Sequence, residues 1–476
     1  MKNKKETISK GILSLLFSQI IVKIIGLIYK LYLTNREGFG DTGNAIYSAG
    51  FQVYALLLAF SSTGIPSALA KLVSERVAIG DNKGAYRIFK IAFYTFSAFG
   101  LLGTILLFLG AHTIATNWLQ IPEAEYSLIT LSQSIFFASV ISVLKGYFNG
   151  RQNLSATAKS QTIEQIFKTI FTIILVELVA YLSKTNTTLM AGVANLATTL
   201  SAFVCFSYLY IFYKSKNKEI AQEISMSTNY IPTRVRKTLK TILKESMPIS
   251  LSSFVASLNR NIDLFTVVRI LKKFMTESDA KIQYGILSGK VDTLCSLPLC
   301  LNIPFVTAMI PSIAKSKSKG RDAEVSTKIS TFLTITVLIS VPSTLIFILF
   351  ANPILKILFP NASSGALLLQ INSVSILFSM LSQTVNGALQ GIGKTHIPAI
   401  SFFMGMIFKF LTNIILISNE SIGINGAAIG NIICNIVVFS IGFFVLHKNV
   451  KLKFDIKSSI FIPILDKINE NSKKSK

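Results

Sequence analysis

The sequence has few charged residues for its length. Of its 476 residues only 14% are Asp, Glu, Lys or Arg, whereas 51% are hydrophobic and the mean hydropathy is +0.57. Soluble proteins carry about 25% charged residues. Apolar runs of about 20 residues, the length that crosses a bilayer as a helix, recur along the whole chain. This composition excludes a soluble enzyme and predicts an all-α polytopic membrane protein.

Residues suited to metal, thiol or nucleophilic chemistry are also scarce. The sequence has three histidines, and its four cysteines lie in apolar stretches without a C-x-x-C spacing. It contains no G-x-x-x-x-G-K-[ST] phosphate loop and no credible nucleophile–His–acid set. We therefore expect buried structural thiols, no catalytic residue, no metal site, no cofactor and no ATP hydrolysis.

The apolar runs predict about twelve transmembrane helices. The predicted spans are 8–33, 43–70, 86–110, 124–148, 156–182, 187–213, 246–271, 284–311, 326–350, 363–391, 396–417 and 423–447. The first run has a basic start, as in a signal peptide, but it contains two lysines and lacks a small-residue cleavage site. We expect it to be retained as the first helix.

The positions of the basic residues predict the orientation. The chain has 47 Lys and Arg against 22 Asp and Glu, a net charge of +25. Between the spans, 34 of the basic residues fall on the side of the N-terminus and 6 on the opposite side. The positive-inside rule then places both termini in the cytoplasm. Because the charge is spread over short segments between apolar runs, we expect no nucleic-acid partner.

Two halves of the chain resemble each other. Residues 144–175 match residues 385–416 at an offset of 241, where the aligned pairs include Gly146 with Gly387, Gly150 with Gly391, and Lys168 with Lys409. Six spans in each half give the two copies the same orientation, as in secondary transporters built from parallel repeats around a central cavity. We expect an N-terminal lobe (1–213), a basic cytoplasmic linker (214–245), a C-terminal lobe (246–447) and a basic cytoplasmic tail (448–476).

Charged residues inside the spans are the candidate site, because such residues usually face a protein interior or a water-filled cavity. The predicted substrate-binding residues are Lys23, Lys30, Lys168, Arg260 and Lys290, and the predicted ion-coupling or charge-pairing residues are Asp263, Lys409 and Glu164. Lys23 and Lys30 are two helical turns apart, so they project from nearly the same face. An equally favoured interpretation makes Glu164–Lys168 and Arg260–Asp263 neutralised pairs that hold helices together.

A net cationic cavity favours an anionic substrate such as a diphosphate, because lysine binds phosphate as a compact point charge. A multidrug exporter of organic cations would be expected to have an acidic cavity. Gly64, Pro66 and Pro298 are predicted hinges, since proline removes a backbone donor and permits a bend, although simple kinking is the default explanation of prolines in membrane helices.

Several stretches resemble one transporter family. They include KGILSLLFSQIIVKIIGLIYKLYL (10–33), STGIPSALAKLVSERVAIGDNKGAYRIFKIA (62–92), YGILSGKVDTLCSLP (284–298) and LQGIGKTHIPAI (389–400). Together they resemble the stage V sporulation protein B and lipid II flippase branch of the polysaccharide exporter superfamily. The resemblance implies two six-helix lobes in the bacterial plasma membrane. It also implies that an undecaprenyl-diphosphate-linked saccharide is flipped to the outer leaflet, with Lys23, Lys30 and Lys290 at the family's basic positions.

The sequence departs from this family in two places. Family members often carry two further helices after the twelfth, whereas residues 451–476 are mostly polar and basic. Some members bind sodium near the seventh helix, where Asp263 is a possible ligand, but Lys409 on a neighbouring helix suggests a built-in cation. Coupling to Na⁺, H⁺ or the membrane potential stays open.

The sequence thus predicts a lipid-linked oligosaccharide flippase that moves lipid II by alternating access. The alternatives are a flippase for another undecaprenyl-linked polysaccharide unit, a multidrug/cation antiporter, and a structural partner of cell-envelope synthesis proteins.

Overall fold

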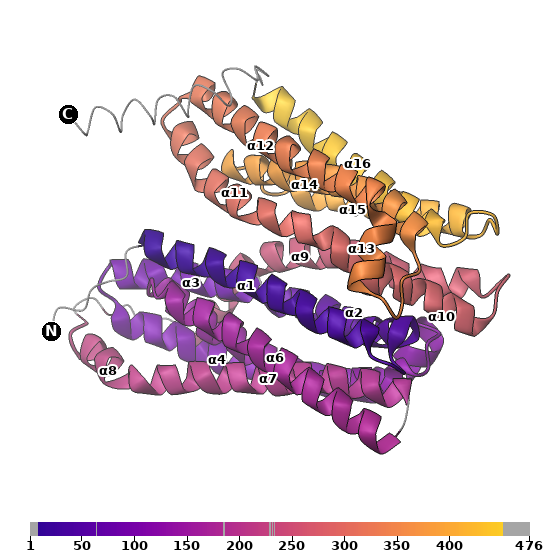
Figure 1. The fold of residues 1–476 in the computed structure, drawn as a ribbon. Coiled ribbons are helices and arrows are strands. Elements are labelled where there is room, and N and C mark those ends of the chain that lie inside the picture. Colours follow the sequence, from indigo (N-terminus) through magenta and orange to yellow (C-terminus); the bar gives the residue numbers. More distant parts are fainter. Residues whose placement is uncertain are drawn as a thin grey trace, which may run out of the picture. The chain divides into compact units, whose positions relative to one another are not determined.

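The computed structural model describes residues 8–62, 64–183, 186–227, 230, 232 and 234–450, and this part of the chain is helical without a strand (Figure 1). The helices of the first half are α1 (Ile8–Asn35), α2 (Gly40–Ser62), α3 (Gly64–Ala78), α4 (Asn82–Thr113), α5 (Ala124–Gly150), α6 (Leu154–Ser183), α7 (Thr187–Ser215) and α8 (Asn217–Ser225). Those of the second half are α9 (Val235–Leu271), α10 (Glu277–Gly285), α11 (Asp292–Ser318), α12 (Asp322–Leu349), α13 (Ala351–Leu358), α14 (Ala366–Gly391), α15 (Ile397–Ile417) and α16 (Asn425–Asn449). Two π-helical segments, η1 (Ile114–Trp118) and η2 (Ile286–Val291), extend α4 and precede α11.

Ten helical segments of the described chain are long and apolar enough to cross a membrane, which confirms the predicted fold class. The predicted second span corresponds to α2 followed by α3, and the eighth to α10, η2 and α11. The predicted first and seventh spans form helices α1 and α9, which stand outside these ten segments. α9 is 37 residues long and carries basic residues along its length, so its hydropathy is low.

The chain packs into two compact units. The first contains residues 1–289 with 359–362, and the second contains residues 290–358 and 363–476. In the first unit α9 packs on α2 and α3, and α10 packs on α2. The predicted lobe boundaries at 213 and 246 stay a prediction. Within the predicted linker, residues 217–225 form α8 and residues 235–245 form the first turns of α9.

The two copies of the half-chain repeat pack against their neighbouring helices in the same way, one copy in each unit. α5 lies on α3 in the first unit, as α14 lies on α11 in the second. A β-carbon at Gly150 would lie 2.8 Å from the Ala70 carbonyl oxygen, and one at Gly391 would lie 3.2 Å from that of Ile310. The repeated glycines therefore let each helix pair approach at backbone distance, as small residues do in membrane helices.

Gly64, one of the predicted hinge residues, lies very close to the backbone of a neighbouring helix. It begins α3, and a β-carbon there would lie 2.7 Å from the Ser246 carbonyl oxygen and 2.9 Å from the Ser250 amide nitrogen of α9. Pro66 lies two residues further along α3. Pro298 is buried in α11. The hinge role of these three residues stays a prediction.

We expect Gly64→Ala to destabilise the protein by about 1–3 kcal/mol, because the added methyl group would force α3 away from α9. Gly110→Ala is the matched control, since its β-carbon would meet only Ile114 Cδ1 at an ordinary 3.5 Å. Replacing a helical glycine there gains about 0.5–1 kcal/mol. Thermal unfolding in detergent measures both variants. Equal melting temperatures would show that α9 does not constrain Gly64.

Candidate functional site

The first unit buries two lysines on neighbouring helices. Lys30 on α1 is 6% exposed and Lys168 on α6 is 7% exposed. α1 runs alongside α6, and the Ser18 hydroxyl donates to the Ala158 carbonyl oxygen at 2.8 Å, which fixes the register of the pair. Of the predicted site residues, these two are the ones that the structure brings into one electrostatic environment, in which their charges repel each other.

Aromatic rings surround the two ammonium groups. Lys168 Nζ lies 4.3 Å from the ring centre of Phe51 and 5.2 Å from that of Tyr29, and Lys30 Nζ lies 4.8 Å from that of Tyr47. The Tyr47 and Phe51 rings are stacked at 5.8 Å, and the Tyr29 and Tyr47 hydroxyls lie 3.1 Å apart. We call these five residues the lysine–aromatic cluster. Sequence reasoning missed its rings, although the i,i+4 spacing of Tyr47 and Phe51 on α2 was a signal for a shared face.

No described carboxylate forms an ion pair with Lys30 or Lys168. The predicted partner of Lys168, Glu164, instead places its Oε2 3.8 Å from Lys145 Nζ on α5. A ring face offers a cation about 0.5–2 kcal/mol, far less than the cost of removing an ammonium group from water. The cluster therefore holds positive charge that an anion would neutralise.

Lys23 differs from Lys30 in its surroundings. It lies seven residues earlier on the same face of α1, but its side chain is exposed and forms no ion pair with any residue that the structure describes. The two lysines differ because Tyr47 of α2 covers Lys30. Two amide oxygens of the same unit, Gln52 Oε1 on α2 and Gln161 Oε1 on α6, are buried and accept no hydrogen bond from a described residue. These groups could bind the hydroxyl groups of a ligand.

The other predicted site residues belong to different parts of the chain. Asp263 is buried in α9, whereas the side chain of Arg260 lies outside the described residues. In the second unit Lys290 is fully buried and donates a hydrogen bond of 3.2 Å to Ser364 Oγ. Lys409 is buried in α15, and a β-carbon at Gly430 of α16 would lie 3.6 Å from Lys409 Cγ, an ordinary contact distance. The predicted roles of these four residues stay predictions.

A buried polar network joins three helices of the second unit, and sequence reasoning missed it. The Asn302 amide of α11 donates to the Met380 carbonyl oxygen at 3.1 Å and to Thr384 Oγ1 of α14 at 3.2 Å. Thr336 of α12 donates to Asn302 Oδ1 at 3.2 Å. Single polar residues in apolar helices give no sequence signal of the partners that they find across the bundle.

Comparison with protein families decides the assignment. A family model described as "Polysaccharide biosynthesis protein" matches residues 8–317, and one described as "Lipid II flippase MurJ" matches residues 220–467. The chain belongs to the polysaccharide exporter superfamily, in the branch of the lipid II flippases. It is thus a membrane flippase for lipid-linked substrates and not an enzyme.

Relatives and solved structures agree with this family. The chain is 24% identical to the "Lipid II flippase MurJ" of Bacillus subtilis, over 96% of this chain and 86% of the relative. It is 23% identical to the "Stage V sporulation protein B" of the same organism, over 89% and 80%. An inward-facing multidrug resistance MATE family transporter has a TM-score of 0.74 at 17% identity, with 92% of this chain and 98% of that chain covered. This last likeness shows the fold alone.

We expect Lys168→Met to raise the melting temperature, because methionine removes a buried charge that no described carboxylate compensates. Lys281→Met is the matched control. Lys281 is 6% exposed, as buried as Lys168, but its ammonium group lies 2.6 Å from Glu123 Oε1 and 2.8 Å from Glu277 Oε1.

Removing one partner of a buried pair costs about 3–5 kcal/mol, and less where the carboxylates are partly exposed, so Lys281→Met should lower the melting temperature. Thermal unfolding of the purified protein without added lipid measures both variants. A fall of equal size in both would show that Lys168 contributes to stability as an ordinary paired residue does.

Proposed function

We propose that this protein moves lipid II, the undecaprenyl-diphosphate-linked peptidoglycan precursor, from the inner to the outer leaflet by alternating access. The observation that carries the proposal is the lysine–aromatic cluster, in which two buried ammonium groups have no ion-paired carboxylate among the described residues. A diphosphate brings the negative charge that this cluster lacks. The names of the matched family model and of the Bacillus subtilis relative support the choice of lipid II.

In this mechanism Lys23, whose side chain is exposed, meets the diphosphate first. Lys30 and Lys168 then bind the diphosphate as point charges, and the stacked rings of Tyr47 and Phe51 hold both lysines in place. The apolar lipid tail stays in the bilayer. Gln52 and Gln161 offer acceptors for hydroxyl groups of the saccharide.

The charges of the second half would serve coupling and substrate binding. In the proposal, Lys409 acts as a built-in cation, Asp263 takes part in ion coupling, and Arg260 and Lys290 bind the substrate. The membrane potential could act on the cationic helices with about 2.3 kcal/mol for each full charge moved through 100 mV. Transport that requires neither Na⁺ nor a proton gradient would support this assignment.

Translocation of fluorescent lipid II in proteoliposomes tests the proposal. We expect Lys23→Ala and Lys168→Gln to reduce transport about tenfold to a hundredfold, because a hydrogen bond to a charged group contributes about 1.5–3 kcal/mol. Lys319→Gln, an exposed lysine in the loop after α11, is the matched control and should transport normally. Normal transport by both site variants would contradict the cationic site.

The alternatives differ in what the wild-type protein moves. If the folded protein moves another undecaprenyl-linked saccharide but not lipid II, the proposed substrate changes and the proposed site stays the same. Export of organic cations would indicate a multidrug antiporter, which the cationic cluster disfavours. A folded protein that moves none of these would favour a structural role beside cell-envelope synthesis proteins.

We further propose that the protein resides in the bacterial plasma membrane with both termini in the cytoplasm. A cysteine introduced at Ser318 should react only with a reagent admitted to the cytoplasm, and one at Glu37 with a reagent added outside. Both positions are exposed in the structure. Labelling of Ser318→Cys from outside intact cells would reverse the orientation.

A further inference from the structure

A second cluster of cations lies at the end of the first unit that the charge distribution predicts to be cytoplasmic. We call it the headgroup cluster and define it as Lys83, Arg87 and Lys90 of α4 together with Lys214 of α7. The α4 residues are spaced four and three apart, so they share one face of the helix. Lys83, Lys90 and Lys214 are exposed, and Arg87 is half-buried.

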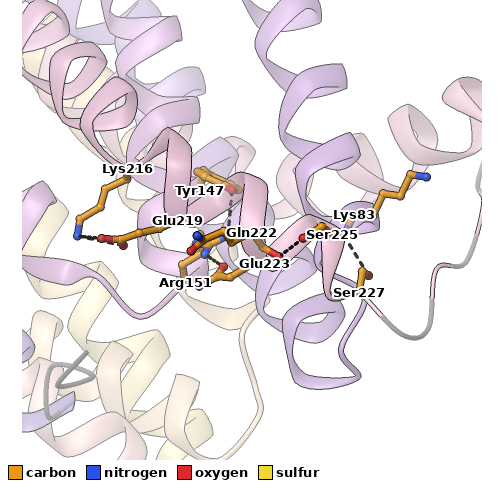
Figure 2. A network of polar contacts seen from close by, with 9 residues as sticks. All are labelled: Lys83, Tyr147, Arg151, Lys216, Glu219, Gln222, Glu223, Ser225 and Ser227. Carbon is orange, nitrogen blue, oxygen red and sulfur yellow. Dashed lines mark hydrogen bonds and ion pairs between the residues drawn. The ribbon is translucent and has the colours of Figure 1, made fainter. Parts of the chain in front are cut away.

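The segment around α8 builds this end of the unit (Figure 2). Glu223 of α8 forms an ion pair with Arg151 at the end of α5, and Arg151 donates to the Tyr147 hydroxyl at 3.1 Å. Ile220 of α8 is buried in the hydrophobic core of the unit. The Ser227 hydroxyl accepts from the Lys83 amide at 3.4 Å and donates to the Gly80 carbonyl oxygen. Much of the predicted linker is therefore docked on the first unit.

Tyrosine rings connect the cations into one surface. Lys83 Nζ lies 4.7 Å from the ring centre of Tyr230, and Arg87 donates to the hydroxyl of the same tyrosine at 2.7 Å. Further along α4, Lys90 Nζ lies 4.9 Å from the ring centre of Tyr86.

The rings continue onto α7. The Tyr86 hydroxyl lies 3.0 Å from that of Tyr213, and Lys214 Nζ lies 5.0 Å from the ring centre of Tyr210. Tyr210 and Tyr213 are neighbours, with ring centres 6.4 Å apart. These ring contacts link α4 to α7 without neutralising the ammonium groups.

Three described carboxylates at this end pair with other cations. Asp81 pairs with Arg76, and Glu219 pairs with Lys216. Glu223 pairs with Arg151. None of the four cluster residues forms an ion pair within the described part of the chain. The cluster thus presents four positive charges to an external anion.

The apolar faces of the same helices continue from the cluster. On α4, Tyr94 is 71% exposed and Leu102 and Leu106 are more than half exposed. On α7, Ile211 is 66% exposed. In a membrane helix, side chains that the protein leaves uncovered face lipid tails. A ligand of the cluster can therefore place a phosphate on the cations and acyl chains on α4 and α7.

We propose that the headgroup cluster binds the phosphate headgroup of an anionic phospholipid of the cytoplasmic leaflet. Lys83, Lys90 and Lys214 bind the phosphodiester oxygens, and the Arg87 guanidinium, held by Tyr230, supplies directed donors. A soluble phosphate compound would use the cations alone and would gain nothing from the exposed apolar faces. The site is separate from the lysine–aromatic cluster and does not depend on the transported substrate.

Lipid binding to the purified full chain tests this proposal. Native mass spectrometry with phosphatidylglycerol and phosphatidylcholine gives the affinity of each lipid. The variant Lys83→Gln/Lys90→Gln/Lys214→Gln should bind phosphatidylglycerol at least tenfold more weakly, because each cation near the surface contributes about 1 kcal/mol to binding anionic lipid. Phosphatidylcholine binding should not change.

The control variant Lys315→Gln/Lys317→Gln/Lys319→Gln removes the same charge from an exposed basic segment at the end of α11. It should keep the affinity for phosphatidylglycerol within about threefold of the wild type. An equal loss of affinity for phosphatidylglycerol in both variants would show that binding depends only on general surface charge, and this result would contradict the proposed site. If millimolar glycerol 1-phosphate displaces bound phosphatidylglycerol as effectively as added lipid does, the ligand is a soluble phosphate compound instead. Unchanged melting temperatures show that the variants are folded.

Discussion

The structure depends on the cost of burying positive charge in an apolar environment. Lysine in a membrane helix must find a partner, water or a ligand, because neither lipid nor aliphatic side chains solvate an ammonium group. The first unit meets this constraint in two ways. Lys281 is buried between two carboxylates, whereas Lys30 and Lys168 lie against aromatic faces and form no ion pair with a described carboxylate. The first arrangement fixes helices in place, and the second keeps charge available to a ligand.

The paired charges occur where helices end. Arg36 and Glu177 form an ion pair at the ends of α1 and α6, with Arg36 Nε 2.9 Å from Glu177 Oε1. Arg151 and Glu223 connect the end of α5 with α8. Between these ends, glycines such as Gly150 allow backbone contact, and hydrogen bonds such as that from the Ser18 hydroxyl to the Ala158 carbonyl oxygen join neighbouring helices. Pairing at the ends and close packing between them allow the unit to tolerate two uncompensated lysines.

The helices, the candidate lysines and the repeat could be predicted from the sequence, since each of these depends on local composition or on a fixed offset. The residues that tertiary packing places beside them could not be predicted. The i,i+4 spacing of Glu164 and Lys168 indicated a pair, but Lys145 of α5 lies 3.8 Å from Glu164. The rings of Tyr47 and Phe51 reach Lys30 and Lys168 from α2, which no local pattern encodes. A short polar helix such as α8 also resembles a linker in the sequence, although Ile220 and Ile224 pack into the core of the unit.

The repeat shows how far a shared scaffold determines chemistry. Lys168 and Lys409 occupy equivalent positions on equivalent helices, and both are buried. Lys168 lies over the rings of Tyr29 and Phe51, whereas the stem of Lys409 lies near Gly430, one turn of helix from Asn413. The surroundings of the two lysines differ, so the same backbone position can serve different purposes in the two halves. The duplicated fold thus determines where a membrane-buried lysine stands, and the residues on the neighbouring helices determine which anion it can bind. That separation is why the proposed anion site belongs to the first unit, although the repeat gives both halves a lysine.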